Sequence, residues 1–211
     1  MNKKFLIFIG MPGSGKGTQG ALISKQMEIE HISLGDVLRS IINTNHRKAK
    51  YLSDNISKGK LVSDDVINEL MLEYIESDKY KTGCILDGYP RKKSQLEFLQ
   101  NKIGNNFTAI YFKIDEQELE NRILNRYICA NCGKIFNKNI DGKIDKCTNC
   151  GSTEFKVRKD DNSDSLKERV KSFNKEILPL LHFLDSKNML ITVDAAKDKS
   201  ILTEDIVSLV K

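Results

Sequence analysis

The sequence contains no apolar run that approaches the roughly 20 residues of a membrane-spanning helix. Its start, MNKKFLIFIG, imitates a secretory signal, but the apolar run extends only from Phe5 to Ile9 and no small-residue cleavage site follows it. We therefore expect a cytoplasmic protein with no membrane partner. The apolar run itself predicts a strand that is buried on both faces.

The chain also lacks internal repeats, low-complexity tracts and a Ser/His/Asp or Cys/His set of the kind used in nucleophilic catalysis. We interpret its three histidines, His31, His46 and His182, as structural or exposed. The formal net charge of +5 suits anionic ligands. This charge does not separate a nucleotide from a nucleic acid, because a lysine-rich surface is usually only a solvated surface.

Strand candidates alternate with helical stretches along the chain. With 211 residues, of which 39% are hydrophobic, the chain can bury a sizeable core. The strand candidates are Phe5–Ile9, His31–Ser33, Cys84–Asp87, Ala109–Asp115 and Met189–Val193. This alternation predicts an α/β fold with a doubly wound, parallel, five-stranded sheet.

Several residues are expected to mark the ends of helices. Asp36 can cap a helix that begins DVLRSII, and Asp115 with Glu118 resembles a capping box before ELENRILNRY. Apolar residues recur at helical spacing over 166–184, which predicts one long helix. Pro179 lies within it and should kink it or start a new turn.

The segment GMPGSGKGT, from Gly10 to Thr18, is the strongest functional signal. It follows a predicted strand and opens a helix, which is the context that a phosphate-binding loop requires. Its glycines allow backbone N–H groups to approach phosphate, the helix N-terminus favours negative charge, and Lys16 can reach the terminal phosphates. Asp87 ends a neighbouring strand candidate, where a carboxylate can hold magnesium directly or through water.

Positive charge is what a phosphoryl-transfer site needs most, together with precise positioning. Among the 34 lysines and arginines, the candidate cations are those in segments that resemble a known family, as described below: Lys16, Arg39, Arg91, Arg122, Arg126, Arg158 and Arg169. Because Arg122 and Arg126 are four residues apart, we expect both to project from one helix face. Any one of these arginines could instead be an ordinary surface residue.

Four of the five cysteines form two C-x2-C pairs, Cys129 with Cys132 and Cys147 with Cys150. In a cytoplasmic chain this pattern favours a metal over disulfides, and zinc accepts four thiolates readily, although iron is also possible. No coordination position would remain open, so the metal should be structural and should stabilise a segment too small for its own core. The fifth cysteine, Cys84, is expected to be a small core residue.

The loop variant G-x-P-G-x-G-K-G-T resembles that of the nucleoside monophosphate kinases. Further segments agree with the family in order, namely HISLGDVLR, GKLVSDD, LDGYPRKKSQ, NRILNR and RKDD with a later arginine. The resemblance spans essentially the whole chain and is greatest to the adenylate kinases of the bacterial type with a long lid. It implies a P-loop NTPase-like core over 1–33, 63–126 and 163–211, an acceptor-binding insert over 34–62 and a zinc-binding lid over 127–162.

The resemblance also implies the reaction and the residues that carry it. The reaction is the reversible, magnesium-dependent transfer of a phosphoryl group from ATP to AMP, giving two ADP, in a monomer without a nucleic-acid partner. The implied catalytic residues are Lys16, Asp87, Arg91, Arg122, Arg126, Arg158 and Arg169. The implied ATP-binding residues are Gly13, Ser14, Gly15, Lys16, Gly17, Thr18, Arg126, Ile135, Phe136 and Lys197. The implied AMP-binding residues are Leu34, Arg39, Lys60, Leu61, Val62, Gly88, Tyr89, Pro90, Arg91, Gln95, Arg158 and Arg169.

The acceptor depends on two positions. Leu34 replaces the threonine that usually precedes Gly-Asp in this family, which should weaken discrimination, whereas Gln95 falls where the family has its adenine-binding glutamine. We therefore expect AMP, with a kinase for GMP, CMP or UMP as the alternative. Two other classes remain: a nucleotide-dependent switch whose zinc module binds a protein, and a zinc-ribbon nucleic-acid binder. The ribbon contains lysines but only one phenylalanine, Phe136, which disfavours the last of these.

Overall fold

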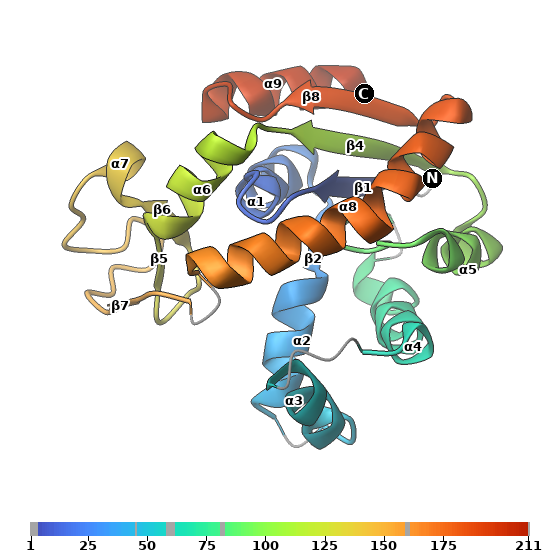
Figure 1. The fold of residues 1–211 in the computed structure, drawn as a ribbon, viewed down its shortest axis with the longest axis horizontal. Helices are drawn as coiled ribbons and strands as arrows, with labels where there is room; N and C mark the ends of the chain where they lie inside the picture. The colour runs from blue at the N-terminus through green and yellow to red at the C-terminus, as the bar shows by residue number, and fades with distance from the viewer. Residues whose placement is uncertain (1–3, 45, 58–61, 81–82, 159–160, 211) are drawn as a thin grey trace.

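The centre of the structure, a computed structural model, is a five-stranded sheet in the order β2-β3-β1-β4-β8 (Figure 1). The structure describes residues 4–44, 46–57, 62–80, 83–158 and 161–210. All pairs of neighbouring strands in this sheet are parallel. The strands are β1 (Lys4–Gly10), β2 (Glu30–Ser33), β3 (Gly83–Asp87), β4 (Phe107–Lys113) and β8 (Leu190–Asp194). The predicted α/β class and its parallel sheet are confirmed.

The central strand β1 sets the position of the site. Its side chains from Phe5 to Ile9 are at most 3% exposed, as expected for a strand covered on both faces. It pairs with β3 on one side, where Phe8 lies opposite Asp87, and with β4 on the other. Ligands of open α/β sheets bind beyond the carboxyl ends of the strands. The phosphate loop and Asp87 both lie at this edge.

Helices cover the sheet and extend from it. They are α1 (Lys16–Met27), α2 (Leu34–Ile42), α3 (Ala49–Ser57), α4 (Asp64–Ile75), α5 (Lys93–Ile103), α6 (Glu116–Leu124), α8 (Ser163–Ser186) and α9 (Lys199–Val210), with a short 3-10 helix at Asp78–Tyr80. In Figure 1, α8 crosses in front of the sheet, α9 lies beside β8, and α2 and α3 extend away from the sheet. None of the helices in the described ranges is long and apolar enough to cross a membrane.

The cysteine segment forms a small antiparallel sheet in the order β6-β5-β7, which the sequence did not predict. Its elements are β5 (Arg126–Cys129), β6 (Ile135–Asn137), the short helix α7 (Lys138–Asp141) and β7 (Phe155–Lys156). Tyr127, Cys129, Phe136 and Cys147 form a hydrophobic cluster separate from the main core. Figure 1 shows this segment at one end of the molecule, next to α6 and the beginning of α8.

Two sequence-based expectations about helices are wrong. The cap of α2 is Ser33 and not Asp36, because the helix begins at Leu34 and the Ser33 hydroxyl accepts the N–H of Asp36. Arg122 and Arg126 do not share a helix face, because α6 ends at Leu124 and Arg126 is the first residue of β5.

The structure confirms the predicted cap residue of α6, the predicted long helix and the predicted core position of Cys84. Asp115 caps α6 as predicted and accepts the N–H of Glu118 at 2.8 Å. The carboxylate of Glu118 does not complete a capping box, since it accepts a hydrogen bond from Arg122 instead. The long predicted helix is α8, which runs through Pro179 as one element. Cys84 is fully buried in β3, where burial raises the pKa of its thiol to about 12, so it is the core residue that was expected.

Candidate active site

The phosphate loop lies between β1 and α1. Gly13 and Gly15 both have a φ of +89°, a backbone conformation that side chains with a Cβ rarely adopt. A Cβ on Gly13 would also lie 2.7 Å from Cγ1 of Ile123 in α6, so glycine is required there for two reasons. Helix α1 begins after Gly15 without a side-chain cap. The N–H groups of its first turn therefore remain available to an anion.

Lys16, the first residue of α1, lies at the centre of a group of charges. Its amine donates to the backbone oxygens of Gly10 at 2.8 Å and Met11 at 3.0 Å. Burial lowers the pKa of Lys16 to about 8, and the negative charge of Asp87 opposes this shift. Three arginines from separate parts of the chain lower the pKa further: Arg91, Arg126 and Arg169. The fold thus brings the loop, β3, the cysteine segment and α8 within electrostatic reach of one amine.

Asp87 ends β3 beside the phosphate loop and is 9% exposed. Burial by itself raises the pKa of Asp87, but His31 and Lys16 outweigh it and hold the pKa below its usual range, so the carboxylate stays ionised. The His31 Nε2 atom lies 3.6 Å from Asp87 Oδ2 and has no hydrogen-bond partner among the described residues. No pattern in the sequence predicts this contact. A buried, ionised carboxylate next to an anion-binding loop suits a magnesium ion carried by a phosphate ligand.

The first arginine pair is anchored by two acidic residues. Arg122 donates through Nε to Glu118 at 2.7 Å and through one terminal nitrogen to the Ala195 backbone oxygen at 2.9 Å. Arg126 forms a two-pronged ion pair with Asp161, whose side chain is fully buried. Asp161 was not among the predicted site residues. The sequence marks its segment, since Asp161 ends the RKDD motif, but its pairing with Arg126 appears only in the structure, because 35 positions separate the partners.

The second pair consists of Arg158, which follows β7, and Arg169 in α8. The Nε atom of Arg158 is buried and has no hydrogen-bond partner among the described residues. Burial lowers the pKa of Arg158, and the positive charges of Arg126 and Arg39 lower it further. Several guanidinium groups close together repel one another, so this site is suited to bind an anion that neutralises more than one of them. Arg169 lies close enough to lower the pKa of both Lys16 and Arg91.

The candidate acceptor residues lie on the insert and on the segment after β3. Arg39 forms an ion pair with Asp36 within α2, and both side chains are exposed. Arg91 donates through Nε to the backbone oxygen of Gly88 at 2.8 Å. The Arg91 side chain is exposed at its surface, but burial of its charged group by the surrounding protein lowers its pKa. Val62 precedes α4 and is partly buried. Two of the predicted acceptor residues, Lys60 and Leu61, lie outside the described residues.

Other predicted acceptor residues are buried. Leu34 is 2% exposed and belongs to the main core. Tyr89 is buried before a cis peptide bond to Pro90, and its hydroxyl donates to Asn68 Oδ1 at 2.8 Å. The Gln95 side chain accepts from the Arg91 backbone N–H at 2.8 Å and donates to Asp64 Oδ1 at 2.9 Å. Their contacts with a bound base remain predictions.

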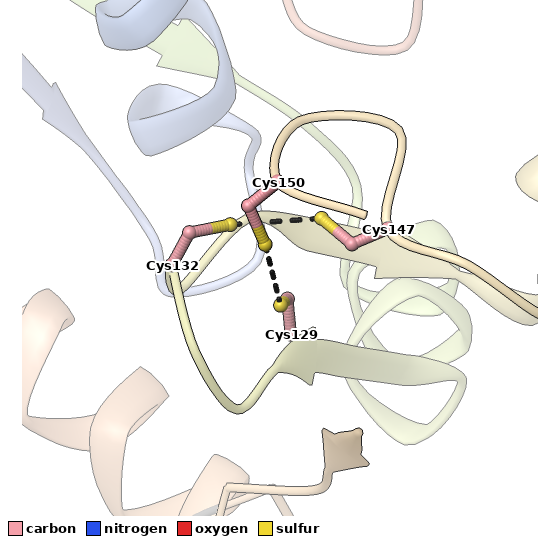
Figure 2. Close-up of side chains that lie close together, drawn as sticks. All are labelled: Cys129, Cys132, Cys147 and Cys150. Carbon is pink, nitrogen blue, oxygen red and sulfur yellow. Dashed lines mark hydrogen bonds between the residues drawn. The ribbon is translucent and has the colours of Figure 1, made fainter. Parts of the chain in front are cut away.

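The four cysteines of the two C-x2-C pairs converge on one point (Figure 2). Their Sγ atoms lie within 4.8 Å of one another. The Sγ atoms of Cys129 and Cys150 are 3.5 Å apart, and those of Cys132 and Cys147 are 3.6 Å apart. A tetrahedral zinc ion with Zn–S bonds of about 2.3 Å requires edges of roughly 3.8 Å. The predicted metal cluster therefore has the right donors at nearly the right spacing.

Two equivalent turns present these thiols. In each, the second cysteine of the pair precedes a glycine with a φ of +74°, Gly133 or Gly151. The glycine N–H donates to the backbone oxygen of the first cysteine of its pair, at 3.0 Å from Gly133 to Cys129 and at 2.8 Å from Gly151 to Cys147. A nearby backbone N–H also stabilises thiolate: the amide of Lys134 is the main cause that lowers the pKa of Cys132 to about 6. Such turns preorganise thiolates for a closed metal site.

Of the remaining predicted nucleotide-binding residues, Ile135 lies near the phosphate loop, whereas Phe136 and Lys197 make contacts elsewhere in the protein. Ile135 is partly buried at the start of β6, and its Cδ1 would lie 3.8 Å from a Cβ on Gly17 of the loop. Phe136 is 2% exposed and packs against Tyr127 with ring centroids 5.6 Å apart, so its side chain belongs to the cysteine segment's own core. The amine of Lys197 is paired with Asp205 in α9.

Comparison with known proteins places this arrangement in a family. A model of the family described as adenylate kinase matches residues 8–189. Proteins named adenylate kinase from Rickettsia conorii and Rickettsia bellii are 37% identical over 208 residues, and one from Rickettsia prowazekii is 37% identical over 209 residues. In each case the match covers 98% of this chain and 98% of the relative.

Proposed function

The chain belongs to the adenylate kinase family, and from that premise we propose that the charged residues around its phosphate loop line a nucleotide-binding cleft, in which the terminal phosphoryl group of ATP is transferred reversibly to AMP, giving two ADP. The observation that carries the residue roles is the convergence on Lys16 of Asp87, Arg91, Arg126 and Arg169 from separate segments. A cleft that holds a donor triphosphate next to an acceptor monophosphate must neutralise both at once. The same family membership disfavours the nucleotide-dependent switch and the nucleic-acid binder.

Each group in the cleft has a proposed role. Lys16 and the loop N–H groups hold the donor phosphates. The phosphate oxygens then accept the hydrogen bonds that the Lys16 amine now donates to the backbone oxygens of Gly10 and Met11. Asp87 would hold the magnesium ion that arrives with ATP, and this ion would supply positive charge to neutralise the terminal phosphates. Arg39 and Arg91 bind the acceptor phosphate. Four arginines surround the transferred group when the cleft is closed: Arg122, Arg126, Arg158 and Arg169.

The cysteine segment is proposed to be a lid that closes over ATP. Its separate hydrophobic cluster and its own sheet support a lid over 127–162 that is distinct from the core, whereas the insert over 34–62 is proposed from the sequence. Cys129, Cys132, Cys147 and Cys150 would hold one structural zinc ion, which stabilises a body too small to fold on its own hydrophobic core. A closed lid keeps water from the phosphoryl group. We also propose, from the sequence alone, that the protein is a monomer and acts in the cytoplasm.

Alanine substitution of Arg126 or Arg169 should lower kcat by about 100-fold or more, with a much smaller change in AMP affinity. These arginines are proposed to meet the phosphoryl group only in the closed state, where they stabilise the transition state more than the ground state. Steady-state kinetics with ATP and AMP would measure both parameters, with Arg47→Ala as the control because Arg47 is exposed and paired with Glu69 away from the cleft. A normal kcat with only a raised KM would assign these arginines to simple binding.

Among AMP, GMP, CMP and UMP, we expect AMP to be the acceptor with the highest kcat/KM. Gln95 supports adenine recognition, whereas the apolar side chain of Leu34 offers the base no hydrogen bond. A coupled assay with ATP and each acceptor should therefore show weaker discrimination in the wild type than in a folded Leu34→Thr variant. If GMP, CMP or UMP surpasses AMP, the chain is a kinase for another monophosphate. If none of the four accepts phosphate, the proposed reaction is wrong.

A further inference from the structure

The amide of Gln95 is held by two partners that cannot exchange roles. Its Oε1 atom accepts the backbone N–H of Arg91 at 2.8 Å, and its Nε2 atom donates to Asp64 Oδ1 at 2.9 Å. A backbone N–H can only donate and an ionised carboxylate can only accept. The two contacts therefore fix which end of the amide is oxygen and which is nitrogen. Gln95 is 4% exposed, so little water is available to substitute for either partner.

Asp64, the first residue of α4, is itself held in place and kept ionised. Its Oδ2 atom accepts the hydroxyl of Ser94 at 3.1 Å, and the amine of Lys92 lies 3.3 Å from Oδ1. Burial alone raises the pKa of Asp64, but the hydrogen bonds from Ser94 and Gln95 and the nearby Lys92 lower it below its usual range. At neutral pH this carboxylate is therefore a permanent acceptor for Gln95.

We propose that Asp64 is a positioning residue for acceptor specificity: by fixing the polarity of the Gln95 amide, it makes the site favour purines with a 6-amino group and reject 6-oxopurines. The inference rests on the proposed function, in which Gln95 faces the acceptor base. Asp64 does not touch the base in this account. It acts only through the orientation of Gln95.

The chemistry of the two bases carries the proposal. With one partner on each polar atom among the described residues, the Gln95 amide still has one lone pair and one N–H to offer. On its Watson–Crick edge, adenine presents the 6-amino group as a donor beside N1 as an acceptor. Hypoxanthine and guanine present the 6-oxygen as an acceptor beside N1–H as a donor. A free glutamine turns its amide over to suit either edge. In this site a turn would set N–H against the N–H of Arg91 and oxygen against the Asp64 carboxylate, which are two repulsive contacts.

The test compares AMP with inosine monophosphate, which differs only at position 6 and the adjacent ring nitrogen. Asp64→Asn should lower the ratio of kcat/KM for AMP to kcat/KM for inosine monophosphate by about tenfold, the contribution of one ordinary hydrogen bond. The ratio should fall from both sides, since a loosened amide serves AMP less well and inosine monophosphate better. Asp65→Asn is the matched control, because Asp65 is an exposed acid in the same helical turn. That variant should keep the wild-type ratio.

A Gln95→Leu variant separates the possible failures. It should abolish the preference by itself, and adding Asp64→Asn to it should change the ratio no further. If Gln95→Leu leaves the ratio intact, the proposed acceptor site is wrong and the inference falls with it. If Gln95→Leu abolishes the preference but Asp64→Asn lowers both acceptors equally, the acceptor site stands and Asp64 has only a structural role. Thermal melting of each variant confirms that the compared proteins are folded.

Discussion

Replacement of Lys16 by alanine should lower kcat for transfer from ATP to AMP by about 100-fold to 1000-fold while the fold remains intact. The reason is that Lys16 lies close enough to Asp87, Arg91, Arg126 and Arg169 for their charges to act on its amine, and removal of one preorganised charge at a reacting group costs this much. The loop should keep its shape, because the Ser14 N–H still donates to the Met11 backbone oxygen and the glycine conformations do not depend on the amine.

Steady-state kinetics and thermal melting of the Lys16→Ala protein would check this result. Lys25→Ala is the matched control, since Lys25 is an exposed lysine in the last turn of the same helix. Near-normal turnover in a folded Lys16→Ala protein would disprove the donor-site assignment. The lowered pKa of Lys16 adds a second readout: because the amine is charged below about pH 8 and loses its proton above it, kcat/KM for ATP should decline above that pH. In Lys16→Arg this decline should disappear, because a guanidinium stays protonated.

Loss of the second cysteine pair should remove the metal and unfold the lid before the rest of the protein. The Cys147→Ser, Cys150→Ser double variant should contain no zinc, against one zinc per chain in the wild type. The separate hydrophobic cluster of this segment includes Tyr127 and Phe136 together with two of the thiols themselves, so little is left to hold it once the metal is lost. We expect transfer to fall by at least about tenfold, because an unfolded lid cannot exclude water from the cleft.

Metal analysis together with local hydrogen exchange over 127–158 would measure both effects. Cys84→Ala is the control: it removes the remaining thiol from the main core and should leave the zinc content at one per chain. Unchanged melting and unchanged exchange in the double variant would refute a structural metal lid. Iron in place of zinc would change the identity of the metal but not the role of the site.

Local signals in the sequence predicted the parts of the fold that depend on neighbouring residues. The apolar run from Phe5 to Ile9 reads as a doubly buried strand because both of its faces are covered. The phosphate loop could be predicted because its glycines are required by the backbone conformation. The metal site could be predicted because metal-binding cysteines recur at a fixed spacing. In each case the structure or the chemistry requires a short sequence pattern, and that pattern has no equally good alternative explanation.

The contacts that set side-chain orientation were not predictable in this way. The spacing of Arg126 predicted a helix, but β5 begins at this residue, and the next residue, Tyr127, lies in the hydrophobic cluster of the cysteine segment opposite Phe136 of β6. The pairing of Arg126 with Asp161 joins the first residue of β5 to a residue just before α8, and that of Gln95 with Asp64 joins two helices. Such pairs exist only after the chain has folded, so no local pattern records them.

The most direct test of the central claim uses ADP as the only nucleotide. Purified protein incubated with ADP and magnesium should convert it to ATP and AMP in equal amounts, because the proposed transfer is reversible and ADP occupies both the donor and the acceptor position. Quantification of the three nucleotides over time would follow the reaction, with Lys16→Ala purified in the same way to exclude a contaminating enzyme. Equal amounts of ATP and AMP from the wild type alone would support the account. Release of inorganic phosphate without ATP, or unchanged ADP, would contradict it.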